Sequence, residues 1–412
     1  PGGLPIPKDW FATTPLSSAD VADDFANLDD LAWLEPIAKS HRVFLFGEAH
    51  YFQVTHHLGA RVLFALNHYD HYGLVTLELP YSLTPFLDRV ATTTDEAAAK
   101  SVFEAHLADV VDVETGELLD HIRAWNRSHP KQVIHVSAHD LEFDRSGVAR
   151  RVLVPYFAAL GSSYTIDPAE VRDLPAFVAK LNTWLPAARA KKLITEPGID
   201  ADYIARVLAN LRSTGNVGGG QGEFWFYRQH AIIRNLTDPA YLGRYFQTGK
   251  VMVWAGAEHL PNHADHVDGG NFLREGAYLT FEFPATKGKT YSMNVLGFAY
   301  SLGAMAGVDP AALRFVGDGY RDTLRKLHAG EQAGVVAPDR AYVDASSGST
   351  ALAMISALDA RNGEPMRLTM IAWDKIAAAV PAARDEIAGF RRELENYDTI
   401  VLVPRSPIVR RH

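Results

Sequence analysis

The feature that most constrains the fold is a series of short, almost wholly apolar segments separated by longer amphipathic ones. Residues 43–46 form such a segment, Val-Phe-Leu-Phe, which Gly47 ends. Comparable segments lie at 74–77, 132–136, 251–254, 291–298 and 399–403. A strand without a polar face is buried on both sides, as in parallel sheets covered by helices. The pattern therefore predicts a buried, mostly parallel sheet.

The segments between these strands have helical periodicity. Helices are predicted at 19–39, 52–72, 83–108, 115–128 and 303–333. The β-α-β-α-β order up to residue 136 predicts right-handed crossovers and a doubly wound sheet. From 147 to 236 only amphipathic helices are predicted, interrupted by a glycine-rich stretch at 215–222 that we expect to be a mobile loop.

These patterns predict an α/β fold with an open, mostly parallel sheet flanked by helices. We expect residues 1–146 to form the first part of this core and residues 237–412 the second part. Residues 147–236 would be an inserted helical subdomain.

Composition excludes several classes of protein. The net charge of −9 repels nucleic-acid phosphate, so DNA or RNA is not expected as the main partner. No apolar segment approaches the roughly 18 residues that a membrane span requires. The chain has no cysteine, which excludes disulfides, thiolate catalysis and cysteine-bound metals. We expect a small-molecule substrate as the partner and favour the cytoplasm over export, while the oligomeric state stays open.

Ionisable residues follow four of the predicted strands. Open parallel sheets bind ligands beyond the carboxyl ends of their strands, so these residues are expected to converge. They are Glu48 and His50, then Glu78, then His139, Asp140 and Glu142, and finally Glu258 and His259. A lone Glu or His in such a place is commonly a turn or structural residue. The paired positions favour function, and we predict Glu48, His50, Glu78 and His259 as catalytic residues.

Other residues are candidates for binding substrate. On the helix predicted at 52–72, Arg61 shares a face with His57 and His68, although a solvated His-rich face is the commoner explanation. The aromatic segment 224–230 contains Tyr227 and Arg228 and precedes the fourth strand. We predict that Arg228 contributes to substrate binding more than to folding. The substrate-binding set is completed by His139 and Glu258.

The order of these motifs resembles the erythromycin esterase-like family, in a wider superfamily with haem-uptake and Tiki-type proteins. The resemblance covers nearly the whole chain. In the first third of the chain it rests on Gly47-Glu48 with His50, the strand ending at Glu78, the pattern His121-Ile122-Arg123-Ala124-Trp125-Asn126, and Ala138-His139-Asp140-Leu141. In the rest of the chain it rests on Arg228 with Asn235, Trp254 to His259, and residues 276–279, 291–298 and 397–403.

The chain departs from the family pattern in two places. In the family the first His comes three residues after the Glu, whereas Glu48 and His50 are two apart. The turn after the fourth strand carries two His in the family, and here the first of these positions is Gly256. Both changes resemble the Gly-Glu-X-His and Gly-X-X-His turns of the wider superfamily.

The resemblance implies a metal-independent hydrolase, or a natural-product tailoring enzyme, without a cofactor. His50 would be the general base, oriented by Glu48 or Glu78, while His259 would act as the acid or as a donor to an oxyanion. Arg228 or Arg61 would hold a carbonyl or carboxylate. A polyketide- or macrolide-like compound would undergo ester hydrolysis or a related proton transfer. No Gly-X-Ser-X-Gly motif suggests an acyl-enzyme.

Two alternatives stay open at this point. Glu48, His50, Glu258 and His259 could together bind zinc, manganese or iron in a metal-dependent hydrolase. The chain could also bind haem or another hydrophobic ligand without turnover.

Overall fold

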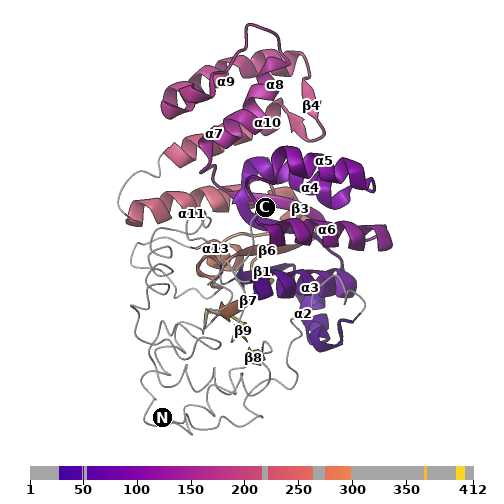
Figure 1. The fold of residues 1–412 in the computed structure, drawn as a ribbon. Coiled ribbons are helices and arrows are strands. Elements are labelled where there is room, and N and C mark those ends of the chain that lie inside the picture. Colours follow the sequence, from indigo (N-terminus) through magenta and orange to yellow (C-terminus); the bar gives the residue numbers. More distant parts are fainter. Residues whose placement is uncertain are drawn as a thin grey trace, which may run out of the picture.

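The computed structural model describes residues 27–48, 50, 53–215, 221–262, 274–297, 366–368 and 396–403. The strands of its main sheet are β1 (Val43–Glu48), β2 (Tyr72–Pro80), β3 (His135–Asp140), β6 (Lys250–Gly256), β7 (Thr290–Gly297), β8 (Met366–Leu368) and β9 (Thr399–Val403). They have the order β3-β2-β6-β1-β7-β9-β8. All neighbouring pairs are parallel except β8 and β9. The predicted α/β class with an open, mostly parallel sheet is therefore confirmed (Figure 1).

The described helices flank this sheet and extend beyond it. They are α2 (Leu34–Ser40), α3 (Gln53–Asp70), α4 (Thr84–Thr92), α5 (Glu96–His106), α6 (Val113–Ser128), α7 (Arg145–Val148), α8 (Val154–Ala158), α9 (Leu174–Ala190), α10 (Ala201–Gly215), α11 (Gln221–Thr237), α12 (Gly243–Thr248) and α13 (Glu275–Phe281). None of the described helices is long and apolar enough to cross a membrane.

The strand order reverses at β1 and β6. From β1 the chain passes through α3 to β2, which lies two positions away, and then outward to β3. Strand β6 later fills the position between β2 and β1, and β7 and β9 extend the sheet on the other side of β1. At such a reversal the connections leave on opposite faces of the sheet, which leaves a crevice beyond the carboxyl ends of the two strands.

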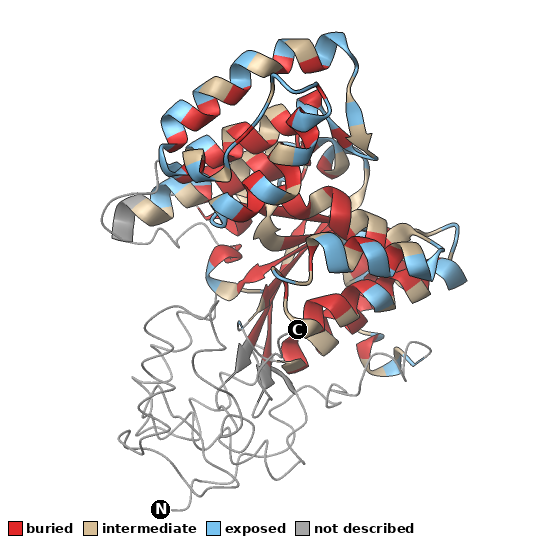
Figure 2. Ribbon diagram, turned by 45° about the horizontal axis from the view of Figure 1, so that its top comes forward, coloured by how far each residue is buried: buried red, intermediate tan, exposed pale blue. Residues whose placement is uncertain are grey.

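The strands are apolar on both faces because each face has its own core. Successive side chains alternate between the two faces. Phe44 and Phe46 therefore join the core formed with α2, α3, α4 and α6, whereas Val43 and Leu45 join a second core with α11, α12 and α13. Figure 2 shows the strands as buried between the helices on either side.

Helices α7 to α10 lie together at one end of the described structure (Figure 1). This helical region also contains a π-helical turn at Ala149–Leu153 and a short antiparallel pair of strands, β4 (Ile194–Glu196) and β5 (Ile199–Asp200), which the sequence analysis did not predict. Helix α11 packs instead on the sheet, because its residues Ile232 and Leu236 belong to the second core. The proposed division at residues 147 and 236 stays a prediction.

Several predicted boundaries change. The segment 83–108 is two helices, because the Asp95 carboxylate accepts hydrogen bonds from the backbone N–H groups of Ala97 and Ala98, at 2.9 and 3.1 Å, and so begins α5. The third strand begins at His135 and includes His139 and Asp140. The helix predicted at 303–333 and residues 19–26 and 216–220 of other predicted elements lie outside the described residues.

Candidate active site

Four of the predicted residues meet at the carboxyl edge of the sheet, beside the reversal of the strand order. Glu48 ends β1, Glu78 lies two residues before the end of β2, and His259 ends a 3₁₀ turn that follows β6. β1 and β2 continue past their apolar segments, and the polar side chains at their ends accept hydrogen bonds from β6: Glu48 from Trp254 and Glu78 from Gly256. The structure thus brings together Glu48, His50, Glu78 and His259.

Glu48 and His50 form a close pair. Nδ1 of His50 lies 2.7 Å from Oε1 of Glu48, and the indole N–H of Trp254 donates to Oε2 at 2.5 Å. Burial raises the pKa of Glu48, but the hydrogen bond and the charge of His50 outweigh this effect and lower the pKa below its ordinary value. Glu48 is therefore an ionised acceptor that keeps a proton on Nδ1 of His50.

The other nitrogen of His50 is directed toward Glu78. Its Nε2 lies 3.7 Å from Oε2 of Glu78, and the side chain of His50 is 43% exposed, so solvent reaches it. Burial lowers the pKa of His50, yet the hydrogen bond to Glu48 and the charge of Glu78 raise it to about 9. His50 is the most exposed member of the four.

Glu78 connects the two histidines. Its Oε2 accepts the backbone N–H of Gly256 at 2.5 Å, while Oε1 lies 3.3 Å from Nε2 of His259 and accepts a hydrogen bond from Arg228. Burial raises the pKa of Glu78, but the charges of His259 and Arg228 hold it well below its ordinary value. The site therefore contains a second ionised carboxylate between two imidazoles.

Arg228 lies in the site with carboxylate partners already in place. From α11 it donates through Nε and a terminal nitrogen to both oxygens of Asp140, at 3.1 and 2.8 Å, in addition to Glu78. Burial lowers its pKa, but the charges of Asp140 and Glu78 raise it above its ordinary value. Aromatic rings surround the guanidinium carbon, those of Phe143, Phe224 and Trp225 at 5.6, 6.0 and 5.6 Å. These contacts support a role for Arg228 in neutralising the buried carboxylates of Glu78 and Asp140 rather than in holding a substrate group.

His259 is almost completely buried, with 2% of its surface exposed. Burial lowers its pKa, but the charge of Glu78 and the nearby carboxylate of Glu275 raise it to about 10. At neutral pH the ring is thus an imidazolium, with Nε2 directed toward Glu78 and 3.3 Å from a terminal nitrogen of Arg228.

The remaining predicted residues do not join this cluster. Arg61 is buried within α3, where its terminal nitrogens donate to both carboxylate oxygens of Asp30 at 2.6 and 2.9 Å. Tyr227 is exposed, and one helical step of about 100° separates it from Arg228. Glu258 is exposed, and its backbone carbonyl accepts a hydrogen bond from Arg274.

His139 lies behind the cluster rather than on its surface. Its side chain is completely buried, and Nδ1 lies 2.9 Å from Oγ1 of Thr76. A substrate cannot reach it in this arrangement, so the predicted substrate contact is replaced by an internal one. The sequence analysis also missed the contributions of Trp254, Gly256, Gln229 and Glu275. Glu275 directly precedes the segment 276–279 that belongs to the family resemblance, but nothing in that segment marked the carboxylate itself as part of the site.

The residues suggested as metal ligands do not form one set. Glu258 lies exposed while Glu48, His50 and His259 turn toward Glu78. Within the described parts of the chain, no group of three or more His, Asp or Glu side chains is arranged to hold a metal ion.

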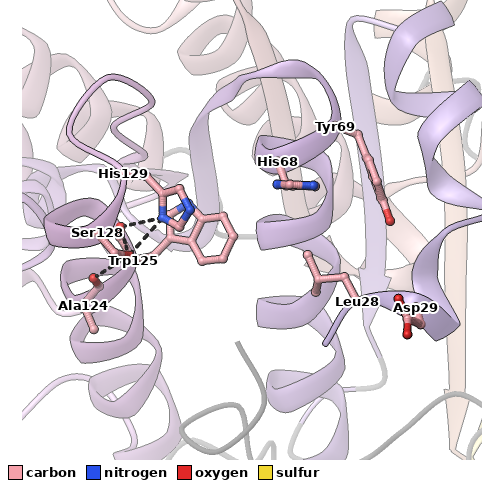
Figure 3. Close-up of a pocket in the computed structure, with 8 residues that line it drawn as sticks. All are labelled: Leu28, Asp29, His68, Tyr69, Ala124, Trp125, Ser128 and His129. Carbon is pink, nitrogen blue, oxygen red and sulfur yellow. Dashed lines mark hydrogen bonds between the residues drawn. The ribbon is translucent and has the colours of Figure 1, made fainter. Parts of the chain in front are cut away.

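A separate cavity of about 490 Å³ lies between the ends of α3 and α6 (Figure 3). Its lining includes His68 and Tyr69 near the end of α3, with Trp125 and His129 at the end of α6. The next strands, β2 and β3, begin a few residues after these helix ends. The cavity therefore lies at the amino edge of the sheet, opposite the cluster and opposite the edge where parallel sheets bind their ligands.

Comparisons with known proteins give no sequence family. No family model matches the chain, and no curated protein matches it. Similar solved structures include a Bacillus cereus protein, with 13% identity, 97% of this chain and 96% of that one covered, and a TM-score of 0.48. A succinoglycan biosynthesis protein has 12% identity, coverages of 69% and 73%, and a TM-score of 0.44.

A third solved structure is a histidine-to-asparagine mutant of erythromycin esterase EreC in its open conformation. It has 15% identity to this chain, covers 66% of this chain and 74% of its own, and has a TM-score of 0.43. Likenesses of this degree identify neither the reaction nor the substrate.

Proposed function

We propose that the chain is a metal-independent, erythromycin esterase-like hydrolase in which His50 is the general base. One observation carries this proposal: Glu48 binds Nδ1 of a half-exposed His50, whose Nε2 is directed toward the buried carboxylate of Glu78. A carboxylate on one nitrogen of an imidazole fixes its tautomer and stabilises the imidazolium that forms when the other nitrogen accepts a proton.

The reaction is hydrolysis of an ester by an activated water. Nε2 of neutral His50 takes a proton from water while the water oxygen bonds to the ester carbonyl carbon. His259, a buried imidazolium whose Nε2 faces Glu78, stabilises the oxyanion that forms through its positive charge rather than through a direct hydrogen bond. When the tetrahedral intermediate collapses, the bond to the alcohol oxygen breaks and His50 returns its proton to that oxygen. The products are an acid and an alcohol, and His50 is again neutral.

The surroundings of the site support a substrate with a large apolar face. Phe143 is 44% exposed, its ring lies 5.6 Å from the guanidinium carbon of Arg228, and it stacks with Phe224 at a ring distance of 6.0 Å. Exposed aromatic groups beside a polar site bury well against extended apolar rings. We therefore include a polyketide- or macrolide-like ester in the proposal, with a related proton-transfer tailoring reaction as its variant.

The test is product analysis by mass spectrometry on a panel of macrolactones and simple esters. A hydrolysed macrolactone should gain the mass of one water and a simple ester should give a separate acid and alcohol, whereas a product of unchanged mass or one that has lost water would identify the tailoring variant. His50→Ala should lower kcat/KM by about 10²- to 10⁴-fold, the usual contribution of a general base. At pH 9 and above its melting temperature should stay close to that of the parent, because His50 is half exposed and the ionic part of its contribution to stability is lost there.

His68→Ala is the matched control, since His68 is an exposed histidine at the opposite edge of the sheet. It should leave kcat/KM unchanged. Full activity in His50→Ala would contradict the proposal. Dialysis against a chelator should also leave the activity intact, and loss of activity that returns with added metal would instead support the metal-dependent alternative.

A further inference from the structure

A second carboxylate–histidine pair lies beneath the site. Glu275, the first residue of α13, is completely buried, and its Oε2 lies 3.5 Å from Nδ1 of His259. Its Oε1 lies 3.7 Å from Nε2 of the completely buried His139. One carboxylate thus faces an imidazole nitrogen with each of its oxygens, in a place that solvent does not reach.

The Glu275 carboxylate faces both imidazoles at distances slightly longer than a hydrogen bond. Both carboxylate oxygens of Glu275 and Nε2 of His139 are buried without a hydrogen-bond partner at normal distance. A buried carboxylate without hydrogen-bond donors is costly, so one this close to two imidazoles is expected to accept hydrogen bonds from them. A shift of a few tenths of an ångström would bring both contacts into hydrogen-bond range.

His139 can serve as a donor to Glu275. Its other nitrogen, Nδ1, contacts the hydroxyl of Thr76 at 2.9 Å, and a hydroxyl can donate to a ring nitrogen. Burial lowers the pKa of His139, so the ring is neutral and carries one proton. With the Thr76 hydroxyl donating to Nδ1, that proton lies on Nε2, toward Glu275.

The side-chain amide of Gln229 contacts the same atom of His259, Nδ1, that the Glu275 carboxylate faces. The backbone N–H of Glu275 donates to Oε1 of Gln229 at 3.2 Å, which turns the amide nitrogen of Gln229 toward Nδ1. An amide nitrogen favours Nδ1 without a proton, whereas a carboxylate favours Nδ1 with one. The Glu275 carboxylate is therefore the group that can keep His259 protonated on this side.

We propose that Glu275 is a positioning residue that holds a proton on Nδ1 of His259, with His139 donating to the other carboxylate oxygen. This inference rests on the proposed function. It makes the site two carboxylate–histidine pairs, Glu48 with His50 and Glu275 with His259, which share Glu78 between their Nε2 atoms. The first pair accepts the proton of water, and the second keeps a cation beside the developing oxyanion.

The charged and titratable groups that face His259 come from every neighbouring element. They are Glu78 on β2, Arg228 on α11, Glu275 on α13, His50 after β1 and, more distant, His139 on β3. Glu78 also favours the imidazolium, so removing Glu275 should weaken the protonation of His259 without abolishing it.

The test is nitrogen-15 NMR of the histidine rings during a pH titration. In the parent protein, Nδ1 of His259 should be protonated at neutral pH. In Glu275→Gln, the pKa of His259 should fall by at least one unit, a tenfold change in its acid dissociation constant. The value of kcat should fall by about tenfold or more while KM changes little, because a positioning partner acts in the transition state.

Glu142→Gln is the matched control. Glu142 is equally buried, but Ser82 and Asn210 bind its carboxylate. Burial raises its pKa to about 7, so a neutral amide should replace it at little cost. This variant should keep the pKa of His259 and kcat of the parent. If Glu275→Gln does not fold, the parent spectrum decides: an unprotonated Nδ1 of His259 at neutral pH overturns the proposal.

The two proposals fail in different ways. An unchanged pKa of His259 in Glu275→Gln overturns the positioning role even if the chain hydrolyses esters. A lowered pKa in a chain that hydrolyses no ester leaves the His259–Glu275 pair in place and contradicts the proposed reaction.

Discussion

The imidazole of His50 stands over the α-carbon of Gly256, so that a β-carbon at position 256 would lie only 2.6 Å from Nε2 of His50. The same β-carbon would lie 3.2 Å from Oε2 of Glu78. The sequence showed two separate departures from the family pattern, the shorter spacing of Glu48 and His50 and the glycine at 256. In three dimensions they are one feature, because the His50 ring uses the space that a side chain at 256 would need.

Gly256→Ala should therefore impair catalysis more than folding. The backbone at Gly256 has a φ of −51°, which alanine adopts without strain, and the half-exposed His50 can swing outward. We expect kcat/KM to fall by about 10²-fold, the effect of a displacement of about 1 Å, with a small change in the free energy of unfolding.

The control for this variant is Gly73→Ala. Gly73 also belongs to a strand of the sheet, but the nearest atom to its added β-carbon would be the carbonyl oxygen of Val133 at an ordinary 3.6 Å. Its activity should match that of the parent. Equal losses in the two variants would show that the effect is not specific to the space occupied by His50.

Gly59→Ala should destabilise the protein although it improves helix propensity. Alanine gains about 1 kcal/mol over glycine in a helix interior. Its β-carbon, however, would lie 2.2 Å from Cη2 of Trp254, and overpacking of this kind costs about 1–3 kcal/mol. The displaced indole would also lose its hydrogen bond to Glu48. Chemical denaturation should show a lower free energy of unfolding, and kcat should fall with it.

A double-mutant cycle separates the steric cause from a general weakening of α3. Trp254→Phe removes the distal ring carbons that the alanine would meet, at the cost of the indole N–H. The double variant should therefore be more stable than the sum of the two single effects, by at least about 0.5 kcal/mol. Strict additivity would contradict this steric explanation.

Arg228→Leu should lower stability as well as activity, which differs from the effect expected from the sequence. The change leaves Glu78 and Asp140 buried with less compensating charge, and breaking a buried ion pair costs about 3–5 kcal/mol. Denaturation of the exposed control Arg127→Leu should shift by less than about 0.5 kcal/mol. A similar small shift for Arg228→Leu would mean that Arg228 acts on the substrate alone.

Activity should increase with pH in the alkaline range. The general base must be neutral, and the pKa of His50 is raised to about 9, so kcat/KM should rise up to about that pH. Loss of the His259 imidazolium near pH 10 then limits the rate at higher pH. A profile that levels off near pH 6.5, the ordinary pKa of histidine, would contradict the Glu48–His50–Glu78 arrangement.

Stability should have the opposite trend over the same range. The pKa values of His50 and His259 are higher in the folded protein than their ordinary value of 6.5. Their contribution is complete below about pH 6.5 and is lost as the pH rises toward 9 and 10. Glu48 and Glu78, with lowered pKa values, contribute above about pH 4.5 and lose this contribution in acid. Melting temperatures should thus be highest near pH 5–6.5 and fall less in a His259→Gln variant at high pH.

The sequence predicted the parts of the fold that depend on burial. The two-faced apolar segments at 43–46, 74–77 and 251–254 each became a strand between two cores. The strands were predicted to end too early, because an apolar segment ends at its first polar residue. The hydrogen bonds between neighbouring backbones continue beyond that point, through Glu48 in β1 and Asp140 in β3. The short edge strand β8 has no such apolar length and was missed.

The sequence predicted those residues of the candidate site that lie at or just after the ends of strands. Glu48, Glu78 and His259 converge because parallel strands share one carboxyl edge. Helical periodicity shows which residues share a face of a helix but not which part of the protein that face contacts. For this reason Arg61 was predicted at the site, whereas it binds Asp30. Glu275 depends on how α13 packs against α11 and β7, a tertiary relationship that no local pattern encodes.

The position of β6 between β1 and β2 also bears on how the chain is made. A ribosome releases β1, β2 and β3 long before residues 250–256, so a sheet formed from these three strands alone would lack the strand that pairs with both β1 and β2. The exposed edges of β1 and β2 could pair with another chain during that interval. A separately supplied fragment beginning near residue 238 would be the natural insert for this place, which makes the protein a candidate for complementation from two pieces.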